Sequence, residues 1–87
     1  MKIIRFNKIS ANINNKIHVL TYELLAETVP GRDSYGIVIM DQTDGSVEMV
    51  LDLTSLEYRA EDFYLSLIQG RVTPVSLREL TEDFLSE

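Results

Sequence analysis

The chain has 87 residues, with 14 acidic and 8 basic side chains and a formal net charge of −6 at pH 7. A chain of this length forms one domain with a modest hydrophobic core. It contains no cysteine and a single histidine, so it lacks the grouped Cys and His of a structural zinc site, and we expect the core to hold without disulfides or structural zinc. The acidic balance argues against nucleic-acid binding, because affinity for phosphates comes mainly from Lys and Arg.

The N-terminal segment is interrupted by the charged residues Lys2, Arg5 and Lys8, so it lacks the continuous apolar stretch of a signal peptide. No segment approaches the roughly 18 apolar residues that a transmembrane helix needs. The sequence therefore predicts a soluble, cytoplasmic protein without membrane partners.

Up to about Thr54, apolar residues alternate with polar ones, which is typical of β-strands. The Asn14-Asn15 pair indicates a turn because Asn tolerates positive φ, and Pro30-Gly31 has the signature of a type II turn. We expect the segment from Pro30 to Ser34 to be a polar loop. The predicted strands are Lys2–Ile9, Ile17–Thr28, Tyr35–Gln42 and Ser46–Leu53.

The last two predicted strands form a hairpin whose register depends on the turn. A two-residue turn at Asp44-Gly45 would place Asp41 opposite Glu48, and facing like charges destabilise a sheet. A three-residue loop over Thr43, Asp44 and Gly45 avoids this and matches the apolar residues on one face. In that register Ile39 is opposite Met49, Ile37 is opposite Leu51, and Tyr35 is opposite Leu53.

The opposite face of this hairpin carries Val38, Met40 and Val50, with Val38 expected to pair with Val50. A half-apolar outer face of this kind is a candidate contact surface. Two-fold dimers are the commonest oligomers, so we expect self-association to use this face if the protein forms a homodimer.

After Thr54 the apolar residues recur every three or four positions, which predicts two helices. Thr54 and Glu57 have the spacing of a capping box, and Gly70 is a natural left-handed helix end. Thr73 followed by Pro74 is a strong start signal for the second helix. The predicted fold is α+β: a four-stranded antiparallel β-meander over residues 1–53, then two helices over 54–87 on one sheet face (ββββαα), in a single domain.

Three segments together suggest a relationship: Tyr35-Gly36-Ile37, Asp52-Leu53-Thr54-Ser55, and the helix from Val72 to Leu85. They resemble a small family of uncharacterised proteins from clostridia-like bacteria, a domain of unknown function. The resemblance covers about the C-terminal two-thirds of the chain. It implies a bacterial cytosolic domain, and it implies a histidine where this chain has Ser76, so no role of that histidine transfers.

Chemical motifs are weak. His18 is a lone histidine that we place on the strand surface, and Asp41, Asp44 and Glu48 are explained by a tight turn rather than a calcium loop. The adjacent acidic residues of the helices point about 100° apart, so they do not form a paired-carboxylate catalytic site. The sequence predicts no catalytic residue, no metal site and no cofactor, and therefore no enzyme.

Two functional hypotheses remain. The first is a protein-interaction or regulatory module that binds a protein partner or a second copy of itself. Its predicted surface comprises the sheet residues Val38, Met40 and Val50 and the acidic helix residues Glu79, Glu82 and Asp83. The alternative is a small-molecule-binding domain with a pocket near the start of the first helix. Its predicted lining residues are Arg32, Asp52, Thr54 and Ser55.

Overall fold

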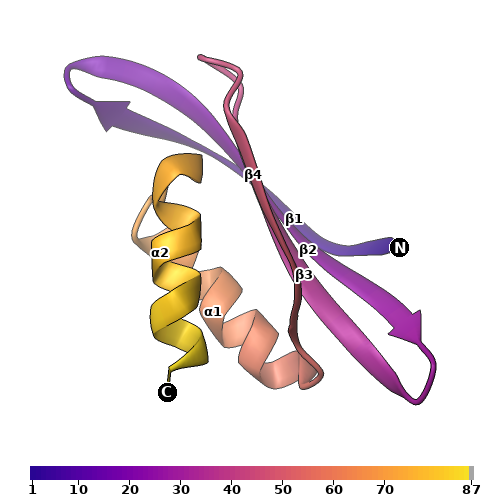
Figure 1. Ribbon diagram of the computed structural model, residues 1–87. Helices are drawn as coiled ribbons and strands as arrows, with labels where there is room; N and C mark the ends of the chain where they lie inside the picture. The colour runs from indigo at the N-terminus through magenta and orange to yellow at the C-terminus, as the bar shows by residue number, and fades with distance from the viewer. Residues whose placement is uncertain (87) are drawn as a thin grey trace.

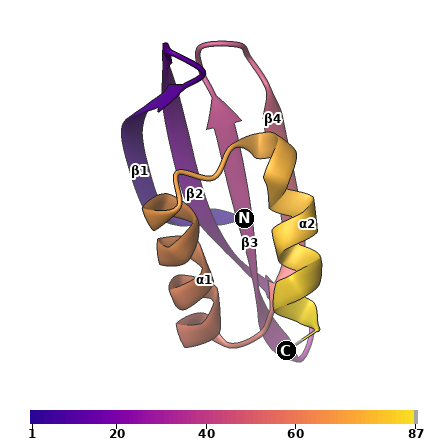
Figure 2. The ribbon, with the colours of Figure 1, turned by 90° about the vertical axis from the view of Figure 1, so that its left-hand side faces the viewer.

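The structure is a computed structural model, and it describes residues 1–86. Within this range its elements are β1 (Lys2–Ile13), β2 (Lys16–Val29), β3 (Arg32–Asp41), β4 (Val47–Thr54), α1 (Glu57–Gln69) and α2 (Pro74–Leu85). The strands form one antiparallel sheet in the order β1-β2-β3-β4. Both helices pack on the same face of that sheet (Figures 1 and 2). The predicted α+β meander followed by two helices is confirmed.

Two tight turns give the sheet its length. Asn14 and Asn15 have φ values of 53° and 66°, as a type I′ hairpin requires. This turn extends β1 to Ile13, beyond the predicted end at Ile9. Gly31 has φ 87° and follows Pro30 in the predicted turn. The predicted polar loop to Ser34 is wrong, because β3 already begins at Arg32 and pairs there with β2.

The predicted register of the β3–β4 hairpin is also wrong, by one residue. Ile39 lies opposite Glu48 rather than Met49, and Ile37 lies opposite Val50 rather than Leu51. The hairpin loop is longer than three residues because the Asp41 carboxylate organises it: Oδ1 accepts a hydrogen bond from the Thr43 N–H at 2.9 Å. A side chain that bonds backbone groups two residues on stabilises such a loop locally.

An irregularity further along the same pair restores the inward position of Leu53. Tyr35 pairs with Thr54, so Gly36 alone opposes the three residues from Leu51 to Leu53. Asp52, with φ 54°, takes the left-handed conformation in this bulge. A bulge changes which face the following side chains occupy, and Leu53 is consequently buried.

The core lies between the helices and the inner face of the sheet. From the helices it takes residues at helical spacing, including Ala60, Tyr64 and Leu67 of α1 and Leu77 and Phe84 of α2. From the strands it takes alternate residues, which is the pattern of a sheet covered on one side. The inward strand residues with the lowest exposure are Leu20, Tyr22, Leu24, Ile37 and Ile39.

Two buried tyrosines tie the layers together. The Tyr22 hydroxyl donates to the Val72 carbonyl at 2.8 Å, which fixes the α1–α2 connection to β2. The Tyr64 hydroxyl of α1 lies 2.9 Å from the Tyr22 carbonyl and 2.8 Å from Asn7 Oδ1 on β1. Burial raises the pKa of Tyr22 and of Tyr64 to about 12, so both hydroxyls stay protonated and able to donate at neutral pH.

The helix ends differ in part from the prediction. The N-cap of α1 is Leu56, and Thr54 Oγ1 instead accepts a hydrogen bond from the Leu56 N–H at 3.2 Å. Thr54 is therefore not a helix cap. Gly70 does end α1, but with φ −82°; the left-handed residue is Arg71, with φ 49°. Thr73 is the N-cap of α2 and Pro74 its first residue, as predicted.

Candidate functional site

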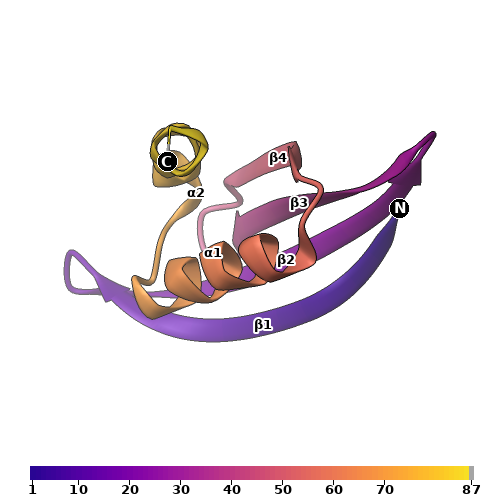
Figure 3. The ribbon, with the colours of Figure 1, turned by 90° about the horizontal axis from the view of Figure 1, so that it is seen from below.

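Both helices lie on one side of the sheet and leave its other face uncovered (Figures 1 and 3). The uncovered face carries apolar side chains from all four strands. Side chains alternate between the two faces of a strand, and Tyr22, Leu24, Ile37 and Ile39 point to the helices. The intervening residues of the same strands therefore point outward. We call the following outward residues the open sheet face: Ile3, Phe6, Ile17, Leu25, Val38, Met40, Val47, Met49 and Leu51.

The centre and the rim of the open sheet face differ in exposure. Val38 and Leu25 are in the middle and are only 8% and 6% exposed. Around them, Phe6 on β1 and the β4 residues Met49 and Leu51 are each about half exposed. Large apolar side chains are thus presented to solvent from one edge strand to the other.

The three sheet residues predicted as contact residues do not all lie on the same face. Val38 and Met40 lie on the open sheet face, but Val50 pairs with Ile37 and packs against the core. The predicted Val38–Val50 pair is therefore wrong, and Val38 lies opposite Met49. This error follows directly from the one-residue register difference, because a slip of one residue exchanges the two faces of a strand.

The acidic residues predicted as part of the same surface, Glu79, Glu82 and Asp83, are exposed on α2. Since α2 covers the opposite side of the sheet, these carboxylates do not border the open sheet face (Figure 1). The structure thus divides the predicted interaction surface between two sides of the molecule.

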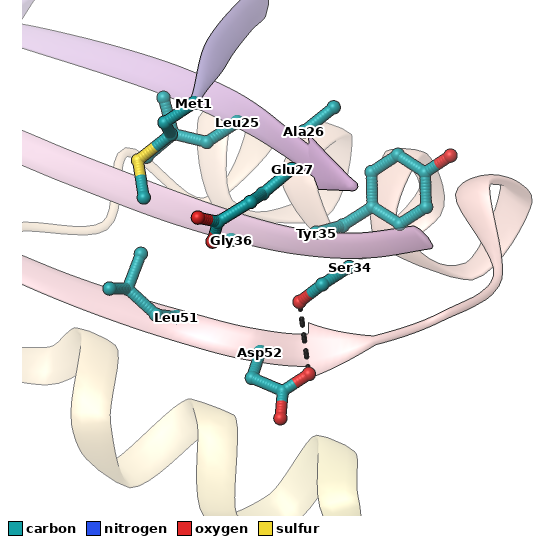
Figure 4. A pocket seen from close by; sticks show the side chains of 9 residues that line it. All are labelled: Met1, Leu25, Ala26, Glu27, Ser34, Tyr35, Gly36, Leu51 and Asp52. Atoms are coloured by element: carbon teal, nitrogen blue, oxygen red, sulfur yellow. Dashed lines mark hydrogen bonds between the residues drawn. The ribbon is translucent and has the colours of Figure 1, made fainter. Parts of the chain in front are cut away.

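Two of the four residues predicted to line a small-molecule pocket do meet. Arg32 donates two hydrogen bonds to the Asp52 carboxylate, of 2.7 and 3.0 Å. Figure 4 shows the third bond, which the Ser34 hydroxyl donates to Asp52 Oδ1 at 2.9 Å. The hydrogen bonds from Arg32 and then Ser34 lower the pKa of Asp52. The other two do not join this group: the Thr54 hydroxyl accepts a hydrogen bond from the Leu56 N–H, and Ser55 is exposed.

The cavity beside this group is very small. Met1, Leu25, Gly36 and Leu51 close it, as Figure 4 shows, and its volume is about 10 Å³. This is about the space that one water molecule needs. We therefore interpret the Arg32–Asp52 pair as a surface ion pair that stabilises the β3–β4 bulge rather than as part of a ligand pocket.

His18 does not lie free on the strand surface, as the sequence suggested. Its Nδ1 is 2.6 Å from Asp41 Oδ2, and both side chains are largely buried. The observed sheet explains the meeting: Leu20 pairs with Asp41, and His18 lies two residues from Leu20 on the same face of β2. This contact was not predicted from the sequence, because predicting it requires knowing that β2 pairs with β3 and that both side chains point to the helix side of the sheet.

The sequence model of a protein family described as a family of unknown function, DUF6514, matches residues 1–87. The chain belongs to this family. The match to DUF6514 covers all of β1, which lay outside the segments that carried the sequence resemblance. No curated protein and no solved structure matches the chain. Within residues 1–86, no helix is long and apolar enough to cross a membrane.

Proposed function

We propose that this DUF6514 chain is a small protein-binding module that forms a homodimer through the open sheet face. The observation that carries the proposal is the apolar character of that face, with Phe6, Met40, Met49 and Leu51 exposed together. Monomeric soluble proteins seldom expose contiguous apolar patches larger than a few hundred Å², and larger patches mark interaction sites.

The size of the face supports a second copy of the chain as its occupant. Four strands about 4.8 Å apart span roughly 19 Å, and the long axis of the molecule measures 46 Å. Their product, roughly 900 Å², is an upper bound on the area of the face, and each partner of a standard interface buries about 800 Å². The sheet is twisted (Figure 1), and two twisted sheets can pack face to face at about 10 Å.

The charges on the face are compatible with two-fold symmetry. Lys8 and Glu23 point outward from β1 and β2, next to Phe6 and Thr21. In a two-fold dimer each patch meets its own copy, so a surface of one sign would repel itself. Charges of opposite sign can instead pair across the axis, which favours one register of association.

Binding, rather than catalysis, is the proposed role of the module. In such a dimer α2 stays outside the interface, and Glu79, Glu82 and Asp83 remain in solvent on each copy. A pair of acidic helices would then be available to a basic protein partner, with attraction that weakens as salt is added. The proposed contact between α2 and a basic partner is supported by charge alone, and it does not affect the test of the dimer.

The test is the oligomeric mass of Leu51→Glu compared with that of Leu65→Glu. These two leucines are 49% and 53% exposed, on the open sheet face and on α1 respectively. The wild type and Leu65→Glu should have about twice the chain mass of 9.9 kDa, measured by sedimentation equilibrium. Leu51→Glu should weaken association at least ~100-fold, since burying an unpaired charge costs several kcal/mol.

Circular dichroism should show the same fold in all three proteins, because both substitutions are at exposed positions. A monomeric wild type at concentrations on the order of 1 mM would rule out the proposed homodimer. An equal loss of mass in both variants would show that association does not depend on the open sheet face.

A further inference from the structure

His18, Asp41 and Asp44 form a cluster at the loop end of the sheet, on the side of the helices. One donor atom from each residue lies within 4.8 Å of the other two. They line a cleft of about 290 Å³ together with Ser46 and the first residues of α2. This volume is far above the roughly 10–15 Å³ that one water requires, so bound water can reach the cluster.

The hydrogen bonds of the two carboxylates leave one oxygen of each on the cluster side. Asp41 Oδ1 accepts from the Thr43 N–H, and Asp44 Oδ1 accepts from the Ser46 N–H at 2.8 Å and from its hydroxyl at 2.6 Å. Asp41 Oδ2 contacts His18 Nδ1. Among residues 1–86, Asp44 Oδ2 has no protein hydrogen-bond partner. The loop bonds therefore hold both carboxylates in place, with Asp44 Oδ2 available to a ligand. A metal ion that binds both His18 Nδ1 and Asp41 Oδ2 would replace the proton that these two atoms share.

The charge of the cluster favours a cation. Asp41 is 97% buried at its side chain, and burial of an ionised carboxylate is costly unless a positive charge compensates it. His18, 2.6 Å away, is the neighbouring group that can share this role with a bound cation. The N-terminus of α2 contributes a positive partial charge of about 0.5, which opposes a cation but is smaller than the charge of two carboxylates. Lys16, which acts electrostatically on Asp44, is exposed and makes no ion pair within the described residues.

We propose that His18, Asp41 and Asp44 bind one divalent transition-metal ion of the Zn²⁺ or Mn²⁺ type. This site is independent of the open sheet face and of the proposed dimer. Imidazole suits zinc and other transition metals, whereas Mg²⁺ and Ca²⁺ prefer oxygen ligands alone. A set of one nitrogen and two carboxylate oxygens, with water from the cleft at the remaining positions, matches an open site with three protein ligands.

The separations of the donor atoms are close to those of a bound site. Ligand atoms about 2.1 Å from a tetrahedral metal lie roughly 3.4 Å from one another. The three donor atoms all lie within 4.8 Å of one another, which is somewhat wider than this spacing. His18 Nδ1 and Asp41 Oδ2 are 2.6 Å apart, so these two atoms move apart when a metal replaces the proton between them. The exposed Asp44 side chain on its loop can approach them by a change of rotamer.

The proposal is tested by isothermal titration of metal-free protein with ZnCl₂ and, separately, with MnCl₂. The variants are His18→Gln and Asp44→Asn, and the control is Asp33→Asn, an exposed acidic residue at the opposite end of β3. Asp44→Asn keeps Oδ1 as an acceptor for Ser46 and so preserves the loop. Wild type and control should bind one ion per chain, and each cluster variant should bind at least ~100-fold more weakly.

NMR of the His18 ring should locate the ion independently of the variants. We expect Zn²⁺ to shift the His18 imidazole signals and Mg²⁺ at the same concentration to leave them unchanged. The proposal fails if neither transition metal binds more tightly than about 1 mM. It also fails if binding persists undiminished in both cluster variants, since the ion would then lie elsewhere on this acidic chain.

Discussion

Replacing Leu77 by alanine should lower the free energy of unfolding by about 2–5 kcal/mol. Leu77 of α2 is fully buried in the core cluster between the helix and the inner face of the sheet. Truncation removes apolar area from the core and leaves a cavity that the surrounding side chains fill only in part. An 87-residue chain is only marginally stable, so this loss is a large share of its total stability.

The measurement is urea unfolding followed by circular dichroism, with Val75→Ala as the matched control. Val75 lies two residues earlier on α2 and is 87% exposed, so its truncation should change stability by no more than about 0.5 kcal/mol. The melting temperature of Leu77→Ala should fall by roughly 4–8 °C for each kcal/mol lost. Equal stability of the two variants would show that α2 does not pack on the sheet as described.

The helices could be predicted from the sequence because their signals are local and agree with one another. In α2, Thr73 and Pro74 mark the start, and Leu77, Thr81 and Phe84 follow at helical spacing. The ends of α1 were less predictable. The residue types favour Thr54 as the cap, but Leu56 takes the N-cap position and Thr54 accepts its N–H instead. The left-handed conformation falls on Arg71 rather than on Gly70. Glycine is the residue that usually takes the left-handed conformation at a helix end. Here the connection to α2 requires that conformation one residue later, at Arg71.

The candidate surfaces could be predicted only in part, since they depend on pairing between strands. Val38 and Met40 were assigned to the outer face from alternation alone, which works within one strand. Val50 was assigned through a hairpin register that the sequence leaves ambiguous, because apolar residues occupy both faces of β4. The neighbouring positions Met49 and Leu51 carry the exposed apolar side chains instead.

The bulge near Asp52 was not predictable from its residue types. Positive φ outside glycine is uncommon, although Asp tolerates it better than most residues. Here Arg32 and Ser34, distant in sequence, hold the Asp52 carboxylate with hydrogen bonds. A contact of this kind exists only once β3 and β4 are paired, so no local pattern announces it. The close approach of the two strands does, however, require a glycine on β3.

Gly36→Ala should therefore be the most informative backbone variant of this sheet. A Cβ added at Gly36 would lie 2.7 Å from the Val50 carbonyl oxygen and 3.2 Å from the Leu51 Cα. These are backbone atoms of the paired strand, which cannot rotate away as a flexible side chain would. We expect the free energy of unfolding to fall by about 3 kcal/mol, the upper end of the usual cost of adding a methyl group to a closely packed site.

Gly70→Ala is the control, since the two substitutions add the same methyl group. Gly70 has φ −82°, and a Cβ there would lie no closer than 3.4 Å to its neighbours. It should change stability by no more than about 0.5 kcal/mol, measured by urea unfolding beside Gly36→Ala. Amide hydrogen exchange should show that protection falls first in β3 and β4, where the strands are forced apart. If Gly36→Ala were as stable as the control, the strands would not approach at Gly36, and the register that places Met49 and Leu51 on the open sheet face would be wrong.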